Sequence, residues 1–216
     1  MEKKIKIGVV DDQQLFRKGL ISLLNEFDDL EVVLEAENGK DLLNKLTVKD
    51  VPHILLLDIE MPIMNGIEVL QKLHDKKSQI KVIIITMHDE EEMVLHLIEK
   101  GANGFLPKSE DIENVVQAIK SVMETGYYFN DKFSNAMLFK IMNEKEIQPK
   151  FATANLADKE IEIIQLICKE YTNKEIAALL HLSVRTIDGY RERILKKIGA
   201  RNTAGIVLYA IKNKLI

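Results

Sequence analysis

Residues with acid, hydroxyl and amine side chains come at the ends of four largely apolar runs: Asp11 and Asp12 after residues 5–10, Asp58 after 54–57, Thr86 after 82–85, and Lys108 shortly after 105–106. Because these runs do not alternate between apolar and polar residues, each is predicted to be a strand buried on both faces. If the strands are parallel, their carboxyl ends meet at the edge where open α/β sheets bind ligands. Three carboxylates, one hydroxyl and one ammonium would then converge, which indicates a magnesium-assisted phosphoryl-transfer site.

The three carboxylates would be unfavourable neighbours without a cation. Two unit charges ~4 Å apart repel by roughly 4 kcal/mol at an effective dielectric of about 20. Mg2+ reverses this interaction and suits a site with few carboxylates, because it prefers oxygen ligands and keeps several waters. The alternative is that Asp11, Asp12 and Asp58 are solvated loop residues, since acids after strands commonly cap helices. Spacing alone leaves both interpretations open.

Helical patterns separate the predicted strands. The first, over residues 13–26, includes Leu15 and Leu23 among its periodic apolar positions and has Asp12 available as a cap. One further strand is predicted at 30–36, and four further helices at 40–49, 67–76, 90–100 and 112–125. Five alternations of strand and helix predict a doubly wound, parallel α/β sheet.

The alternation stops after residue 126. A helix is predicted over 129–142, and residues 143–154 are polar, contain Pro149 and are predicted to be a linker. Only helices follow, at 157–169, 173–180, 184–198 and 203–213, and the short turn at 181–183 is typical of a helix-turn-helix. The predicted organisation is an acid-bearing domain over 1–126, a partly helical linker over 127–153 and a small all-α domain over 154–216.

Charge divides the chain in the same way. The formal net charge is −4, but residues 151–216 hold 11 Lys and Arg against 7 Asp and Glu, whereas residues 1–150 hold 19 against 27. The basic end is therefore the candidate for contact with a polyanion. The single cysteine, Cys168, excludes an intramolecular disulfide, and no apolar run reaches the ~18 residues that span a bilayer. Together with an amino terminus that lacks a signal-peptide core, this predicts a soluble cytoplasmic protein with no membrane contact.

The strand-end residues also carry a family resemblance. The segment Asp58-Ile59-Glu60-Met61-Pro62-Ile63-Met64-Asn65-Gly66, with Val10-Asp11-Asp12, Ile85-Thr86 and Leu106-Pro107-Lys108, resembles the receiver domain of bacterial two-component response regulators over residues 4–126. This resemblance implies a flavodoxin-like sheet of five parallel strands in the order 2-1-3-4-5. It also implies that a sensor histidine kinase donates a phosphoryl group to this domain.

The resemblance assigns roles to individual residues: Asp58 as phosphoacceptor; Asp11, Asp12, Asp58 and the backbone carbonyl of Glu60 as Mg2+ ligands; Thr86 and Lys108 as phosphoryl contacts; and Thr86 with Phe105 as a conformational switch. The chemistry agrees, because a carboxylate is a competent phosphoryl acceptor and cations stabilise the transferring group. Glu60 and His88 occupy positions that tune the lifetime of the phosphoryl group in the family.

Residues 154–216 resemble the LuxR-type helix-turn-helix, on Leu156-Ala157-Asp158-Lys159-Glu160 and Thr172-Asn173-Lys174-Glu175-Ile176-Ala177, which is typical of the NarL/FixJ class. Ser183 would cap the helix that enters the major groove of double-stranded DNA, with Ile187, Tyr190, Ile194 and Ile198 facing the core. The predicted DNA-binding residues are Thr172, Asn173, Lys174, Arg185, Thr186, Asp188, Gly189, Glu192, Arg193, Lys196 and Arg201. The last helix is unusually apolar, and in the family it forms a dimer contact, so a homodimer is expected on phosphorylation.

Two acids depart from the family pattern on the predicted DNA face. Asp188 and Glu192 stand where basic or apolar residues are common. A carboxylate there can accept a hydrogen bond from cytosine N4. It can equally pair with Arg185, Arg191 or Lys196 on a solvated face. Gly189 costs about 1 kcal/mol relative to alanine in mid-helix, which is offset if it lets the helix approach the base edges more closely.

Three functions compete at this point. The first is a transcription regulator, not an enzyme, whose DNA binding is controlled by phosphorylation. The second is an aspartate-nucleophile phosphatase resembling haloacid dehalogenases, but those enzymes carry Asp-x-Asp after the first strand, where this chain has Asp11-Asp12-Gln13. The third is a constitutive DNA-binding protein with a vestigial receiver. The presence of every acid, hydroxyl and amine that phosphorylation needs, and of a basic helical domain, favours the first.

Overall fold

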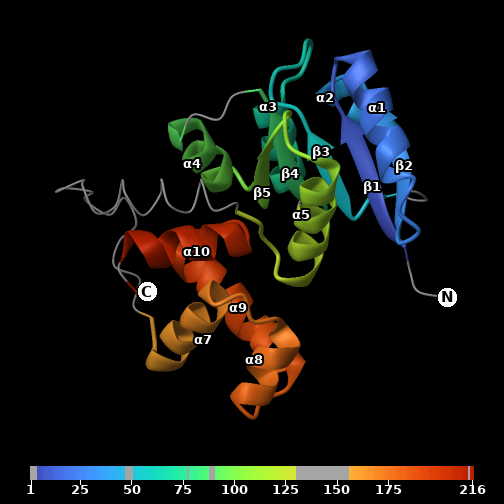
Figure 1. Ribbon diagram of the computed structural model, residues 1–216. Helices are drawn as coiled ribbons and strands as arrows, with labels where there is room; N and C mark the ends of the chain where they lie inside the picture. Colours follow the sequence, from blue (N-terminus) through green and yellow to red (C-terminus); the bar gives the residue numbers. More distant parts are fainter. Residues whose placement is uncertain (1–3, 47–50, 77, 88–90, 130–155, 214) are drawn as a thin grey trace.

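Figure 1 shows a computed structural model of the chain, which describes residues 4–46, 51–76, 78–87, 91–129, 156–213 and 215–216. Its first part is built on five parallel strands: β1 (Ile5–Val10), β2 (Leu30–Ala36), β3 (Ile54–Leu57), β4 (Lys81–Thr86) and β5 (Gly104–Pro107). Their order in the sheet is β2-β1-β3-β4-β5. The predicted fold class and strand order are confirmed.

The strands lie at the centre because their side chains are apolar on both faces. All four residues of β3 are buried, as are the last five of β4. Parallel strands need crossover connections, usually helices, and these cover both faces of the sheet.

Five helices cover the sheet: α1 (Gln14–Leu24), α2 (Gly39–Lys45), α3 (Gly66–Asp75), α4 (Glu91–Glu99) and α5 (Ile112–Glu124). Leu20 and Leu24 of α1 pack with Val115 and Ile119 of α5 in one apolar core on one face. Residues of α2, α3 and α4 pack in a second core on the other face. The sheet is therefore doubly wound, and the carboxyl ends of all its strands open at one edge.

Two details of the first helix differ from the prediction. The N-cap of α1 is Gln13, not Asp12, and it makes no side-chain capping bond; instead the Gln13 N–H donates to Asp11 Oδ1 over 2.8 Å. Leu15 is also 89% exposed and Leu23 is 43% exposed. The buried stripe is set by Leu20 and Leu24, and Leu15 lies roughly 140° around the helix from Leu20.

Four helices form the second part: α7 (Asp158–Cys168), α8 (Asn173–Leu179), α9 (Val184–Ile198) and α10 (Thr203–Lys212). Isoleucines at 163, 164, 176, 187 and 194 are all fully buried and make its core. Burial raises the pKa of Cys168 to about 12, which keeps this thiol protonated and unreactive. The predicted helix over 129–142, except Phe129, and the predicted linker over 143–154 lie outside the described residues.

The two parts pack against each other. Helix α10 lies beneath α4 in Figure 1 and contacts it, and the buried residues of both parts form one continuous apolar cluster. The Tyr127 hydroxyl, just after α5, donates to the Ile167 carbonyl of α7 over 3.2 Å. Within the described part of the chain, no helix has the length and apolar content needed to cross a membrane.

Candidate functional site

Three carboxylates converge at the carboxyl edge of the sheet. Asp11 directly follows β1 and Asp58 directly follows β3, and these two strands are hydrogen-bonded neighbours. Asp11, Asp12 and Asp58 each place one carboxylate oxygen within 4.8 Å of the others. Asp11 and Asp58 are 2% and 3% exposed, whereas Asp12 is exposed. One acid of the cluster is therefore accessible to solvent, and the other two are buried.

Lys108 joins the two buried acids. Its Nζ lies 2.8 Å from Asp11 Oδ2 and 2.8 Å from Asp58 Oδ2, and all three side chains are 3% exposed. The ammonium also lies 5.0 Å from the centre of the Phe16 ring, a favourable cation–π contact. Burial disfavours the charged form of Lys108, but its hydrogen bonds to Asp11 and Asp58 outweigh this, so the pKa of Lys108 lies above its ordinary value.

Asp58 itself is held in an unfavourable environment for a lone carboxylate. Burial raises the pKa of Asp58, the negative charge of Asp11 acts in the same direction, and the bond from Lys108 offsets only part of the rise. Further hydrogen bonds to the charged form come from the Ile59 N–H at 2.7 Å and the Glu60 N–H at 3.4 Å. A metal cation bound beside Asp58 would therefore offset the negative charge that Lys108 compensates only in part.

The donor set fits Mg2+. Carboxylate oxygens from two neighbouring strand ends are hard ligands, and one exposed acid leaves room for the waters that this ion retains. Asp11, Asp12 and Asp58 would hold the ion, and its charge would offset that of a transferring phosphoryl group.

The predicted switch residues lie on the neighbouring strands. Thr86 ends β4 and is 1% exposed, and its carbonyl accepts from the Lys108 N–H over 2.8 Å. Phe105 lies on β5 opposite Ile84 of β4, is 6% exposed and packs in the core that also contains α4. Position 88, where His88 was expected to tune phosphoryl lifetime, lies outside the described residues.

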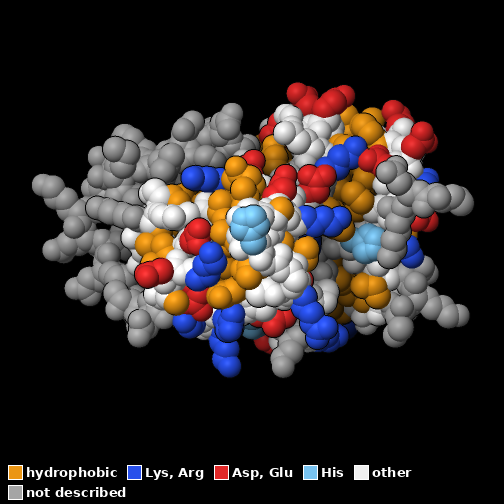
Figure 2. Space-filling view, turned by 90° about the horizontal axis from the view of Figure 1, so that it is seen from below, with side chains coloured by type: hydrophobic (Ala, Val, Ile, Leu, Met, Phe, Trp, Pro, Cys, Tyr) orange, Lys and Arg blue, Asp and Glu red, His pale blue; other side chains and the backbone are white. Residues whose placement is uncertain are grey.

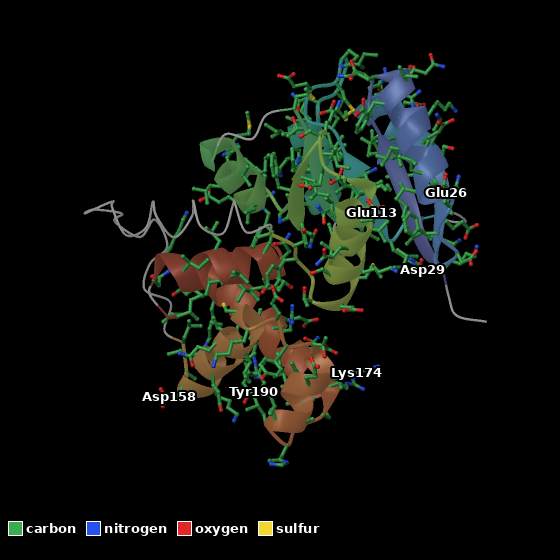
Figure 3. All side chains as sticks on the ribbon, viewed as in Figure 1. Glu26, Asp29, Glu113, Asp158, Lys174 and Tyr190 are labelled. Atoms are coloured by element: carbon green, nitrogen blue, oxygen red, sulfur yellow. The ribbon has the colours of Figure 1, made fainter. Side chains whose placement is uncertain are left out.

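The second part of the chain has helix-turn-helix geometry. Thr172 caps α8 in a reciprocal capping box with Glu175, and the Ser183 side chain accepts from the Thr186 N–H at the start of α9. Ile187, Ile194 and Ile198 are buried on the inner face of α9, while Tyr190 is only half-buried. Arg185, Asp188, Glu192 and Lys196 are exposed on the opposite side. Figure 3 shows the Lys174 side chain projecting away from α8.

Family models match both parts of the chain. The family described as "Response regulator receiver domain" matches residues 7–120, and "Bacterial regulatory proteins, luxR family" matches residues 154–210. The chain belongs to the response regulators. It is a DNA-binding transcriptional regulator of a two-component system, with a receiver domain and a LuxR-type helix-turn-helix domain.

Relatives of the same length support this assignment. The response regulator is 31% identical to the transcriptional regulatory protein DegU of Brevibacillus brevis, over 98% of this chain and 95% of DegU. It is 33% identical to the oxygen regulatory protein NreC of Staphylococcus aureus, over 98% of this chain and 99% of NreC. Among solved structures, the response regulator ChrA of a heme-sensing two-component system aligns with a TM-score of 0.52 at 28% identity, covering 99% of both chains.

The outer face of α9 in this response regulator carries charges of both signs. Asp188 accepts from the Asn173 amide of α8 over 2.6 Å, rather than pairing with Arg185 or Lys196. Arg193 stacks over the Tyr190 ring at 4.4 Å. Figure 2, which looks from below the view of Figure 1, shows basic, acidic and apolar side chains interspersed, with no uniformly basic surface.

Arg201 is placed differently from the other predicted DNA-binding residues. Its guanidinium donates to the Lys100 carbonyl over 3.0 Å and to Gln71 Oε1 over 3.4 Å, both in the receiver domain. The neighbouring Asn202 amide donates to the carbonyls of Gly101 and Ala102. In this arrangement Arg201 satisfies the Lys100 carbonyl after α4, so a phosphate contact by Arg201 requires this junction to open.

Sequence reasoning missed the positions of two arginines: the buried Arg17 was not considered, and the half-buried Arg191 was placed on the solvated face of its helix. Arg17 of α1 is 9% exposed, donates to the Asp11 carbonyl and lies 3.7 Å from Glu35, so it anchors the loop that bears two of the acids. Arg191 of α9 donates to Asn173 of α8 and to Thr203 of α10. Both were detectable in principle, because each occupies an apolar position in a helical repeat: Arg17 precedes Leu20 and Leu24, and Arg191 follows Ile187.

We expect Gly189→Ala to stabilise the response regulator and to weaken its binding to DNA. A methyl group at Gly189 would meet no atom within 4 Å, so the substitution should add about 1 kcal/mol through helix propensity alone. If α9 approaches base edges at this point, the same methyl group would hold the helix away. Gly19→Ala in α1 is the matched control, since that site is equally open. Equal DNA affinity of the two variants, measured by fluorescence anisotropy, would contradict close approach at Gly189.

Proposed function

We propose that phosphorylation of Asp58 by a sensor histidine kinase controls DNA binding by the α8–α9 unit. The observation that carries the proposal is Lys108 bridging Asp58 and Asp11 at 2.8 Å each, beside a third carboxylate within 4.8 Å. This site brings an acceptor, an ammonium and a candidate metal site together. The Asp58 carboxylate can attack the phosphorus of a phosphohistidine on the kinase: the P–O bond of the acyl phosphate forms, the P–N bond breaks and the imidazole leaves, while Lys108 balances the charge on the transferring oxygens.

Mg2+ is the cofactor we propose for this step. Asp11, Asp12, Asp58 and the backbone carbonyl of Glu60 would hold it, and it supplies the charge compensation that phosphoryl transfer needs. The raised pKa of Asp58 supports this role, because a carboxylate destabilised by burial and by Asp11 gains most from a nearby cation.

The switch that we propose runs from Thr86 and Phe105 to the domain junction. Thr86 would bind the phosphoryl group, and Phe105 shares a core with Val94, Leu97 and Ile98 of α4. Helix α4 in turn contacts α10, and the carbonyls of the two residues after α4 accept hydrogen bonds from Arg201 and Asn202. A change at Thr86 would thus reach the contact that holds the DNA-binding domain, and release of α10 would allow a homodimer.

Phosphorylation should increase both self-association and DNA affinity. A phosphoryl group acts only through different affinities for two conformations, and the closed junction occupies Arg201 and α10 in one of them. The test is sedimentation velocity and DNA titration of the full chain, with and without acetyl phosphate in Mg2+. Asp58→Ala treated in the same way is the control. If neither property changes on phosphorylation of the unaltered chain, the proposed control is wrong.

We propose that the chain acts as a regulator in the cytoplasm and has no separate enzymatic substrate. The second candidate is a phosphatase with an aspartate nucleophile, which would need a second acid two residues after the nucleophile to act on the leaving group. Glu60 is in that position, but its side chain is exposed. Hydrolysis of a generic phosphate ester by the unmodified chain in Mg2+ would favour the phosphatase.

A further inference from the structure

An arginine lies within the apolar stripe of α9. Arg191 is four residues after Ile187 and three before Ile194, so all three share one helix face. The two isoleucines are fully buried, whereas Arg191 is half-buried at the boundary of the core. A guanidinium brought out of water in this way needs hydrogen-bond partners to offset its desolvation.

Its partners link three helices. Arg191 Nη1 donates to Asn173 Oδ1 of α8 over 2.6 Å, and Arg191 Nη2 donates to the Thr203 hydroxyl of α10. Asn173 in turn donates through Nδ2 to Asp188 Oδ1 of α9 over 2.6 Å. The result is a chain of hydrogen bonds, Thr203–Arg191–Asn173–Asp188, which we call the Arg191 relay.

The relay fixes the orientation of one side-chain amide. A guanidinium can only donate hydrogen bonds and an ionised carboxylate can only accept them. The Asn173 oxygen must therefore face Arg191, and its NH2 group must face Asp188. Rotating the amide by half a turn would place donor against donor and acceptor against acceptor. Without Arg191, Asp188 alone would oppose that rotation, and the Asn173 oxygen would lose its donor.

The fixed groups lie where DNA would be read. Asn173 is the first residue of α8 and Asp188 is in the second turn of α9, exposed on its outer side. An asparagine amide and a carboxylate are both side chains that discriminate between bases, the first by donating and accepting and the second by accepting from cytosine. We propose that Arg191 is a positioning residue that sets the base preference of the chain by orienting Asn173 against Asp188, an inference that rests on the proposed DNA-binding role.

The relay also ends at the receiver domain. Thr203 begins α10, and a Cβ added at Gly126, which follows α5, would lie 2.5 Å from the Thr203 hydroxyl. The receiver backbone at Gly126 therefore lies against Thr203, whose hydroxyl accepts the hydrogen bond from Arg191 Nη2. Opening the domain junction would change the surroundings of Thr203 and, through Arg191, the orientation of Asn173.

The experiment compares the sequence preference of full-length variants. Selection from random duplexes identifies the preferred site of the unaltered chain; titrations with this duplex and a scrambled one then measure discrimination. We expect Arg191→Leu and Asn173→Ala each to reduce discrimination at the same base pair by roughly five- to a hundredfold. The double variant should lose no more than either single variant, because both act through one amide. Affinity for the scrambled duplex and its salt dependence should not change, since Arg191 neutralises no phosphate.

Three outcomes would overturn the inference. An unchanged preferred sequence in a folded Arg191→Leu protein would show that Arg191 sets no preference. Equal losses for preferred and scrambled duplexes would assign Arg191 a structural role only, and Asn173→Ala separates this case from misfolding because it leaves the inner face of α9 intact. Absence of any sequence preference in the unaltered chain would contradict the proposed DNA-binding role together with the relay. Lys159→Leu, which removes a surface cation of α7 that pairs with Glu162 and lies outside the predicted DNA-binding residues, is the control and should leave the preferred sequence unchanged.

Discussion

Asp58→Ala will abolish phosphorylation of the chain by acetyl phosphate in Mg2+. An acyl phosphate requires a carboxylate oxygen at the acceptor position, and methyl cannot replace it. Intact-mass measurement detects the added phosphoryl group directly, and the unaltered chain run in parallel gives the full signal.

Asp12→Ala is the informative companion to this experiment. It keeps the acceptor and the buried Lys108 bridge and removes only the exposed acid of the cluster. We expect the Asp12→Ala protein to be phosphorylated once the Mg2+ concentration is raised, because loss of Asp12 weakens metal binding and leaves the nucleophile in place. Aspartyl phosphate in the Asp58→Ala protein would show that another residue is the acceptor.

Lys108→Met will slow phosphorylation by about a hundredfold or more and destabilise the receiver by about 3–5 kcal/mol in the absence of Mg2+. The first effect follows from losing the ammonium beside the transferring group. The second follows because Asp11 and Asp58, each 2.8 Å from Nζ and 3% exposed, would be left as uncompensated buried charges. Mg2+ should restore much of the lost stability, because it supplies the missing positive charge.

The destabilisation caused by Lys108→Met should depend on pH in a defined direction. Burial already raises the pKa of Asp58 above its usual value, and loss of the ammonium raises it further. An acid whose folded pKa is raised binds its proton more tightly when folded, so the free energy of unfolding falls as pH rises through the interval between its unfolded and folded pKa values. The variant should therefore lie closer to the unaltered chain at about pH 5 than at about pH 8.

Urea unfolding of both proteins at these two pH values measures the effect. Lys120→Met is the matched control, because Lys120 also pairs with an aspartate, Asp29 at 2.6 Å, but on the surface with both side chains about half exposed. An exposed pair is worth about 0–1 kcal/mol. Equal destabilisation by the two substitutions would show that the Lys108 bridge is not the stabilising interaction inferred from its geometry.

The sequence by itself determined the fold and the membership of the acidic site. Continuous apolar runs can be buried only in the interior of a sheet covered on both faces, and parallel strands bring their carboxyl ends to one edge. Asp11, Asp58 and Lys108 therefore had to meet once the strands paired. The helices of the second domain were also predictable to within a few residues, because caps such as Ser183 and the isoleucine spacing of α9 are local signals.

Only the tertiary structure decided how the polar groups pair across helices. Nothing local distinguishes an Arg201 that reaches DNA from one that satisfies the Lys100 carbonyl, since the partner is a hundred residues away in the chain. The same holds for Asp188, which pairs with Asn173 of another helix because Arg191 orients that amide. Periodicity reports which face of an element is buried, whereas the choice among polar partners depends on the distances and angles that packing sets. Apolar patterning is thus readable from the chain, and hydrogen-bond partnership is not.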